Sequence, residues 1–130
     1  MEVIKENKVT KNKYKIAIVG LGYVGLPLAV EFSKYYNVTG YDINTKRINE
    51  LKSGFDGTSE VKAKNLKNSK NLYFTSNSND LIHANIFIIT VPTPVFKNKQ
   101  PDLSLLAKAI SIIGNCFDFS LISIVSSSLS

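Results

Sequence analysis

The stretch Lys15–Phe32, KIAIVGLGYVGLPLAVEF, joins a short apolar run to a helix-like pattern through three glycines. The run Lys15–Val19 predicts a strand that is buried on both faces of a parallel sheet. The mostly apolar residues after the glycines predict a helix, in which Pro27 is tolerated because it lies in the first turn. The stretch therefore predicts a strand, a tight turn and a helix in direct succession.

The rest of the chain repeats this alternation of strands and helices. Strands are predicted at about 37–42, 72–74, 85–91 and 121–125, and helices at about 45–52, 80–84 and 101–115. The segment 55–70 carries only a weak helical pattern, and the expected apolar stripe of the last helix is Leu105, Leu106, Ala109, Ile110 and Ile113. This order predicts an α/β fold, a Rossmann-like, doubly wound parallel sheet with helices on both faces.

Length and composition set the organisation of the chain and its expected location. The 130 residues are enough for one domain, predicted at 14–130 after a flexible basic leader at 1–13. A single cysteine, Cys116, cannot form an internal disulfide, and no signal peptide or membrane-spanning run is recognised. We therefore expect a cytoplasmic protein without membrane contact.

The net charge of +6 raises the question of nucleic-acid binding. The lysines gather in the leader and in the polar middle segment, without stacking aromatics between them and without a helix-turn-helix or zinc-finger spacing. A solvated surface explains them, and nucleic acid is not expected as a partner.

The three glycines have the spacing G-x-G-x-x-G, and each has a physical role in binding a dinucleotide. Gly20 permits the tight turn out of the strand, Gly22 lets a pyrophosphate approach the backbone, and Gly25 allows close packing of helix and strand. The helix N-terminus then favours the negative charge of the phosphates. The alternative is that these glycines only shape a strand-to-helix turn.

Asp42 follows the second predicted strand, 22 residues after Gly20, where a carboxylate can accept hydrogen bonds from the adenosine ribose. It would repel a 2′-phosphate, so the expected cofactor is NAD rather than NADP. In the alternative interpretation Asp42 caps the next helix. Arg47 is either a ligand of the adenosine or of a phosphate, or a solvated helix residue.

Several motifs together resemble the UDP-glucose/GDP-mannose dehydrogenase family. They are VGLGYVGLPLA, GYDIN, R-I-x-x-L, F-T-S, I-I-T-V-P-T-P and Q-P-D-L-x-x-L, spread from Lys15 to about Val125. The match is most similar to the members that make UDP-N-acetylhexosaminuronic acids for bacterial surface polysaccharides. The resemblance implies an enzyme that oxidises the C6 hydroxyl of a nucleotide sugar to a carboxylate with two NAD, and that forms a homodimer.

The resemblance also implies roles for individual positions. Gly20, Gly22, Tyr23, Val24 and Gly25 match the pyrophosphate loop, Asp42 the ribose acid and Arg47 its basic neighbour. Thr93 matches a threonine at the cofactor's edge, although V-P-T-P also fits a rigid strand exit, and Ser128 takes the place of a second threonine. The expected cofactor-binding residues are therefore Gly20, Gly22, Tyr23, Val24, Gly25, Asp42, Arg47, Thr93 and Ser128.

The chain departs from the family pattern after the fifth predicted strand. The family's nucleophilic cysteine, its lysine and its asparagine belong to later motifs that this sequence does not contain, so the domain is expected to be truncated and inactive alone. Cys116 lacks the motif and is interpreted as a small apolar filler, and His83 as a surface or helix-end residue. No catalytic residue and no metal ligand are predicted, and a UDP-sugar is expected only for the full-length parent.

Two other interpretations stay open at this stage. The chain can be a degenerate fragment that binds nothing, or a Rossmann module of a 6-phosphogluconate or 3-hydroxyisobutyrate type of dehydrogenase. The V-P-T-P and P-D-L motifs argue against the second.

Overall fold

The computed structural model describes residues 13–115 and 121–124 and contains one parallel sheet of five strands. The strands lie in the order β3-β2-β1-β4-β5, with the bounds β1 (Lys15–Val19), β2 (Asn37–Tyr41), β3 (Leu72–Thr75), β4 (Ile86–Ile89) and β5 (Leu121–Ile124). The helices are α2 (Gly25–Ser33), α3 (Thr45–Lys52), α4 (Ala63–Asn68), the 3₁₀-helix η1 (Ser78–His83) and α5 (Ser104–Gly114). The predicted Rossmann-like α/β fold is confirmed.

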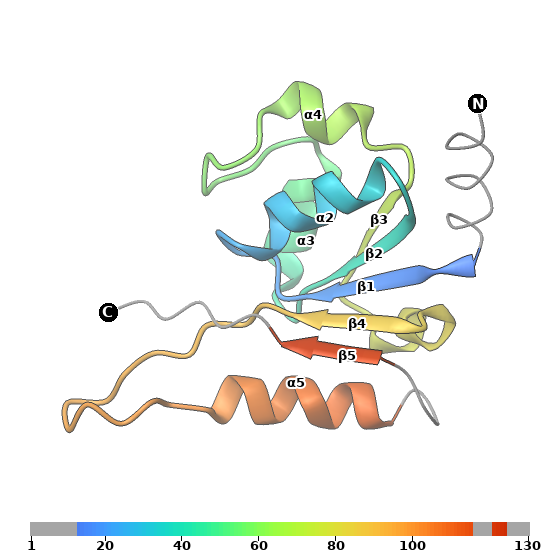
Figure 1. Ribbon diagram of the computed structural model, residues 1–130. Coiled ribbons are helices and arrows are strands. Elements are labelled where there is room, and N and C mark those ends of the chain that lie inside the picture. Colours follow the sequence, from blue (N-terminus) through green and yellow to red (C-terminus); the bar gives the residue numbers. More distant parts are fainter. Residues whose placement is uncertain (1–12, 116–120, 125–130) are drawn as a thin grey trace.

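The helices cover both faces of the sheet, with α2, α3 and α4 on one side and α5 on the other (Figure 1). Because side chains alternate along a strand, Ile16 and Ile18 of β1 pack in a core cluster with residues of α2, α3 and α4. Ala17 and Val19 point to the opposite face, where they join a cluster with residues of η1 and α5. Burial on both faces explains why β1 and β4 read as unbroken apolar runs.

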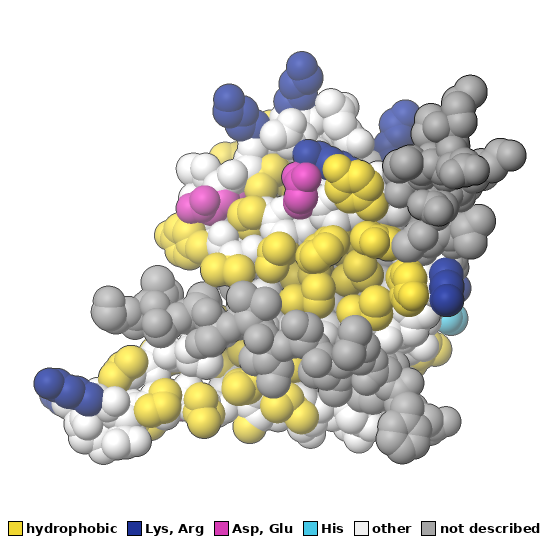
Figure 2. Space-filling model, in the orientation of Figure 1, with side chains coloured by type: hydrophobic (Ala, Val, Ile, Leu, Met, Phe, Trp, Pro, Cys, Tyr) yellow, Lys and Arg dark blue, Asp and Glu magenta, His cyan; other side chains and the backbone are white. Residues whose placement is uncertain are grey.

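The last helix is less deeply buried than its apolar stripe predicts. Ala109 and Ile113 belong to the core, but Leu105 and Ile110 are each 42% exposed. Figure 2 shows hydrophobic side chains along α5 and the loop before it, at the lower edge of the view. The helical periodicity of the apolar residues therefore predicted the helix correctly but overestimated how much of its surface packs against the sheet.

Several sequence predictions concern residues that the structure does not describe. The predicted leader falls outside the described residues except for its last position, and Cys116 and Ser128 also lie outside them. His83 is exposed at the end of η1, as predicted.

The strand order determines where a ligand can bind. After β3 the chain crosses over the sheet to β4, which pairs with β1 on the side opposite to β2. The carboxyl ends of β1 and β4 therefore diverge into loops on different faces, and this switch point is where open α/β sheets bind ligands.

Candidate functional site

The glycine turn between β1 and α2 has a closed side that packs against β4. Gly20 has a φ of +100°, and a Cβ there would lie 3.1 Å from the Thr90 backbone. A Cβ on Gly25 would lie 1.7 Å from the Gly20 carbonyl oxygen and 2.4 Å from Thr90 Oγ1. Thr90 Oγ1 also donates a hydrogen bond of 2.6 Å to the Gly20 carbonyl. These two glycines are required by the fold itself.

The other side of the turn is open. A Cβ added to Gly22 would meet no atom of the described residues within 4 Å. The N–H groups of Gly22, Tyr23 and Val24 donate to no acceptor among the described residues. Helix α2 begins directly after them, with no side-chain cap and no acidic residue in its first turn. Free N–H groups and an uncapped helix N-terminus together favour an anion at this point.

Asp42 follows β2 and connects this strand to the turn. One carboxylate oxygen accepts a hydrogen bond of 2.9 Å from the Leu21 N–H, and the other accepts one of 2.9 Å from the Asn44 N–H. Asn44, rather than Asp42, caps α3, because its side chain accepts from the N–H groups of Lys46 and Arg47. A carboxylate has about four acceptor positions, so Asp42 keeps capacity for a ligand.

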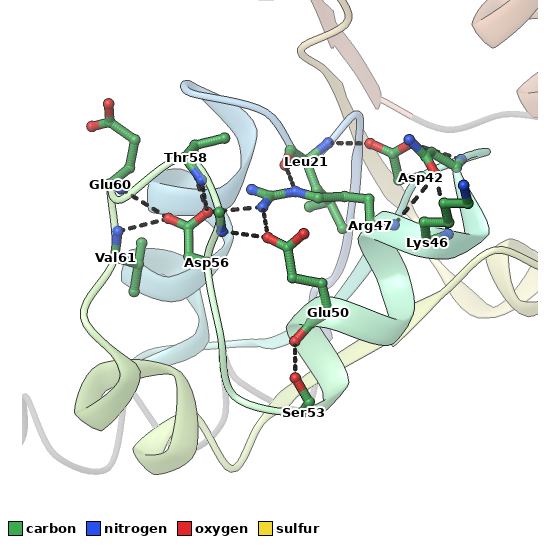
Figure 3. Close-up of polar contacts among 12 residues, drawn as sticks. Leu21, Asp42, Lys46, Arg47, Glu50, Ser53, Asp56, Thr58, Glu60 and Val61 are labelled. Atoms are coloured by element: carbon green, nitrogen blue, oxygen red, sulfur yellow. Dashed lines mark hydrogen bonds and ion pairs between the residues drawn. The ribbon is translucent and has the colours of Figure 1, made fainter.

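Arg47 is a largely buried ion-pair residue, and its interpretation as a solvated helix residue is wrong. Its side chain is 10% exposed, and Nη1 lies 2.7 Å from Glu50 Oε1 and 2.8 Å from Asp56 Oδ1. Nε donates a hydrogen bond of 2.8 Å to the Leu21 carbonyl, so that the guanidinium connects the glycine turn to the acids of the following segment (Figure 3). Arg47 is not among the described residues that line the cleft above the turn.

Asp56 is the buried centre of the Asp56 loop, which comprises residues 56–61. Besides the bond from Arg47, its carboxylate accepts the N–H and hydroxyl of Thr58 and the N–H groups of Glu60 and Val61 (Figure 3). Burial alone would raise the pKa of Asp56, but hydrogen bonds from Thr58, Val61 and Arg47 outweigh it and lower the pKa to about 2. Asp56 is therefore ionised under ordinary conditions.

A cleft of about 580 Å³ lies over the open side of the turn. Residues of the turn and of the strand ends line it together with residues of α5. The described residues that line it are Val19, Gly20, Leu21, Gly22, Tyr23, Val24, Tyr41, Asp42, Ile43, Thr58, Thr90, Val91, Pro92, Leu105, Lys108, Ala109 and Ile112. The lining is largely apolar, with Asp42 as its carboxylate, and this character suits the rings of a nucleotide.

The cleft brings together most, but not all, of the predicted site residues. Gly20, Gly22, Tyr23, Val24 and Asp42 line it, and Gly25 lies beneath the turn. Thr93 is buried and does not line the cleft.

Sequence reasoning missed several residues that line the cleft, among them Thr58, Thr90 and the residues of α5. Thr90 could have been found, because it is the polar residue that ends the apolar run of β4 beside Gly20. Its N–H donates to the Val19 carbonyl, which continues the register of β1 and β4 into the turn.

Within the described residues, no group of three or more His, Cys, Asp and Glu side chains is placed to bind a metal ion. The same residues contain no helix that is long and apolar enough to cross a bilayer.

Comparison with known proteins agrees with the geometry of the turn. The model of the UDP-glucose/GDP-mannose dehydrogenase family, NAD binding domain, matches residues 14–129. The chain belongs to this family. Membership identifies it as an NAD-binding domain and argues against a module of another dehydrogenase type.

Individual relatives lead to the same result. UDP-N-acetyl-D-glucosamine 6-dehydrogenases from Pseudomonas aeruginosa and Salmonella typhi are 58% and 52% identical over 100 and 103 residues. These alignments span 77% and 79% of this chain and 24% of each relative. The structure of a UDP-D-ManNAc dehydrogenase from Pyrococcus horikoshii superposes with a TM-score of 0.80 at 38% identity, covering 86% of this chain and 28% of that one. The chain therefore spans about a quarter of the length of these relatives.

Proposed function

We propose that NAD binds in this cleft with its pyrophosphate on the open side of the glycine turn. The observation that carries the proposal is the empty space at Gly22 beside the N–H groups of Gly22, Tyr23 and Val24, which have no acceptor among the described residues. Two phosphates would supply the missing acceptors, and the N-terminus of α2 would stabilise their charge. Gly20 and Gly25 contribute indirectly, because they let the turn adopt this shape.

Asp42 is proposed to bind the adenosine ribose. Its two oxygens each accept one backbone hydrogen bond, and the remaining acceptor capacity faces the cleft that Asp42 lines. Ribose hydroxyls are donors and would fit this position, whereas a 2′-phosphate would meet a negative charge. The site is therefore proposed to select NAD over NADP.

The proposal also includes the other predicted site residues, and each of them has its own support. Tyr23 is 59% exposed beside the cleft, where its ring can cover a bound cofactor. Arg47 supports the turn through Leu21 and is proposed to act on the cofactor mainly through that contact. Thr93 and Ser128 stay predictions from the family resemblance, and Ser128 lies outside the described residues.

We propose that a longer protein containing this domain oxidises the C6 hydroxyl of a UDP-N-acetylhexosamine. The support is the 58% identity to a UDP-N-acetyl-D-glucosamine 6-dehydrogenase, which exceeds the 36% to 39% identity to UDP-N-acetyl-D-mannosamine dehydrogenases. Bound NAD supplies a nicotinamide ring that accepts hydride. A homodimeric parent and a cytoplasmic location, where NAD and nucleotide sugars are available, belong to the same proposal.

The 130-residue chain alone is proposed to bind the cofactor without turnover. None of the described residues that line the cleft is a cysteine or a histidine, so the described part of the cleft lacks the nucleophile that the family's reaction uses. Mixing the chain with NAD and UDP-N-acetylglucosamine should produce no NADH by absorbance. Turnover that disappears in Cys116→Ser would contradict this.

Isothermal titration calorimetry of the whole chain tests the binding proposal. NAD and NADH should bind, and NADP should bind more weakly by on the order of tenfold or more. Equal affinities would reject the role of Asp42. Absence of any binding by a folded chain would favour the interpretation as a degenerate fragment.

A further inference from the structure

We infer that Asp56 is a positioning residue of the NAD cleft, which holds both the glycine turn and Thr58 in place. This inference rests on the proposed binding of NAD in that cleft. Asp56 itself does not line the cleft, and its side chain is fully buried. Its carboxylate nevertheless contacts Arg47, which binds the glycine turn, and Thr58, which lines the cleft.

The first connection runs through Arg47 to the glycine turn (Figure 3). Asp56 Oδ1 accepts Nη1 of Arg47 at 2.8 Å, and Nε of the same guanidinium donates to the Leu21 carbonyl at 2.8 Å. Asp42 holds the Leu21 N–H from the other side at 2.9 Å. The backbone C=O and N–H of Leu21 are thus both held by side chains. Because Gly22 follows directly, the direction of its free N–H depends on how Leu21 is held.

The second connection runs to Thr58, which lines the cleft. Asp56 Oδ1 accepts the Thr58 N–H at 2.9 Å and the Thr58 hydroxyl at 2.6 Å. The other oxygen accepts the N–H groups of Glu60 and Val61, each at 2.9 Å. Ser59, in the middle of this loop, has a φ of 58°, which an L-residue keeps only when its surroundings enforce it. The Asp56 loop is therefore wound around one carboxylate, and Thr58 has a fixed position.

Stability alone is a weak explanation for this arrangement. A buried ion pair often contributes little net stability, because both charges lose their hydration. Nη2 of Arg47 is also buried, and it has no hydrogen-bond partner among the residues that the structure describes. A network selected only for stability would not retain that cost, whereas a network that orients the cleft can.

The chain offers a matched carboxylate that makes a similar local contact without itself lining the cleft. Asp80 Oδ2 accepts the Thr75 hydroxyl at 2.5 Å, as Asp56 accepts that of Thr58, and neither Asp80 nor Thr75 is among the described lining residues. Asp80→Asn therefore removes a charge from a threonine-bound aspartate without touching the cleft.

The test compares Asp56→Asn and Arg47→Lys with Asp80→Asn in the whole chain. Affinities for NAD and for ADP are measured by calorimetry at a temperature where circular dichroism shows every variant to be folded. In Asp56→Asn and Arg47→Lys, the Kd for both ligands should rise by about tenfold, because the positioned groups contact the adenosine diphosphate half. In Asp80→Asn the Kd should stay within about twofold of the unmodified chain.

The outcomes separate this inference from the proposed function. An unmodified, folded chain that binds no NAD would overturn the proposed site and the inference with it. If the unmodified chain binds NAD and folded Asp56→Asn binds it equally well, Asp56 serves only the fold and the inference alone is wrong. Should Asp56→Asn not fold, Arg47→Lys decides by the same criterion, since it keeps the charge but cannot contact Leu21, Glu50 and Asp56 with one planar group.

Discussion

The protein leaves no room for a side chain on one side of the glycine turn, but it does on the other. On the closed side, a Cβ on Gly25 would lie 1.7 Å from the Gly20 carbonyl oxygen. On the open side, a Cβ on Gly22 would come within 4 Å of no atom in the described part of the chain. The folded chain thus explains Gly25, and the NAD proposed for the cleft would explain Gly22. The motif therefore contains a folding requirement at Gly25 and a proposed binding requirement at Gly22, which substitutions can separate.

The largest effect on stability is expected from a substitution on the closed side of the turn. Gly25→Ala should lower the free energy of unfolding by at least about 3 kcal/mol, because the methyl group must displace backbone at Gly20 and the hydroxyl of Thr90. Urea unfolding followed by circular dichroism measures this loss.

Gly114→Ala is the matched control, because a Cβ at this last residue of α5 also meets nothing within 4 Å. It should leave stability unchanged or raise it by up to about 1 kcal/mol. A Gly25→Ala variant as stable as this control would contradict the packing described for the turn.

The open side should show the opposite behaviour. Gly22→Val should weaken NAD binding by about 100-fold or more, since its methyl groups would occupy the space proposed for the phosphates. The free energy of unfolding should change by less than about 1 kcal/mol. Calorimetry and urea unfolding on the same preparation give both numbers. Retained affinity would show that the pyrophosphate does not lie over Gly22.

The comparison also shows which parts of the site are readable in the sequence. The strand Lys15–Val19 and the helix Thr45–Lys52 follow from local patterns, and the structure confirms them. The same holds for the roles of Gly20 in the turn and of Gly25 in close packing, whereas their role in cofactor binding stays a prediction. These features depend on neighbours close in the sequence or on regular periodicity. A tight turn between a buried strand and a helix leaves few alternatives.

The polar network was not predictable in the same way. Arg47 binds Asp56, which lies in a segment without clear periodicity, and it binds the carbonyl of Leu21, 26 residues earlier. No local sequence pattern predicts a contact between residues so far apart in the sequence. The exposure of Leu105 and Ile110 was also missed, since an apolar stripe shows which face a helix can bury but not how much surface its partner offers.

Acid should weaken the contacts that the ionised Asp56 makes with Arg47 and with its own loop. The pKa of Asp56 is lowered from 3.8 to about 2, so its contribution to stability is present above about pH 4 and is lost as the pH falls through about 2. This contribution amounts to roughly 2 kcal/mol. Urea unfolding at several pH values should show a smaller acid-induced loss for Asp56→Asn than for the unmodified chain. Identical pH profiles would show that Asp56 does not keep this low pKa.

The smallest effect is expected on the choice between NAD and NADP, for which Asp42 is proposed to be responsible. Asp42→Ala should reduce the ratio of NAD to NADP affinity by about tenfold, because the carboxylate no longer faces the 2′-phosphate. Affinity for NAD itself should also fall, since Asp42 holds the Leu21 N–H at 2.9 Å.

The ratio of the two affinities is therefore the informative quantity, because loss of the Leu21 contact weakens both cofactors alike. Asp42→Asn sharpens the test, since its amide oxygen can still accept one of the two backbone hydrogen bonds while the charge is gone. Both variants should shift the ratio by a similar factor if charge is the cause. A shift in Asp42→Ala alone would assign the selectivity to the shape of the turn, and no shift in either variant would remove Asp42 from cofactor selection.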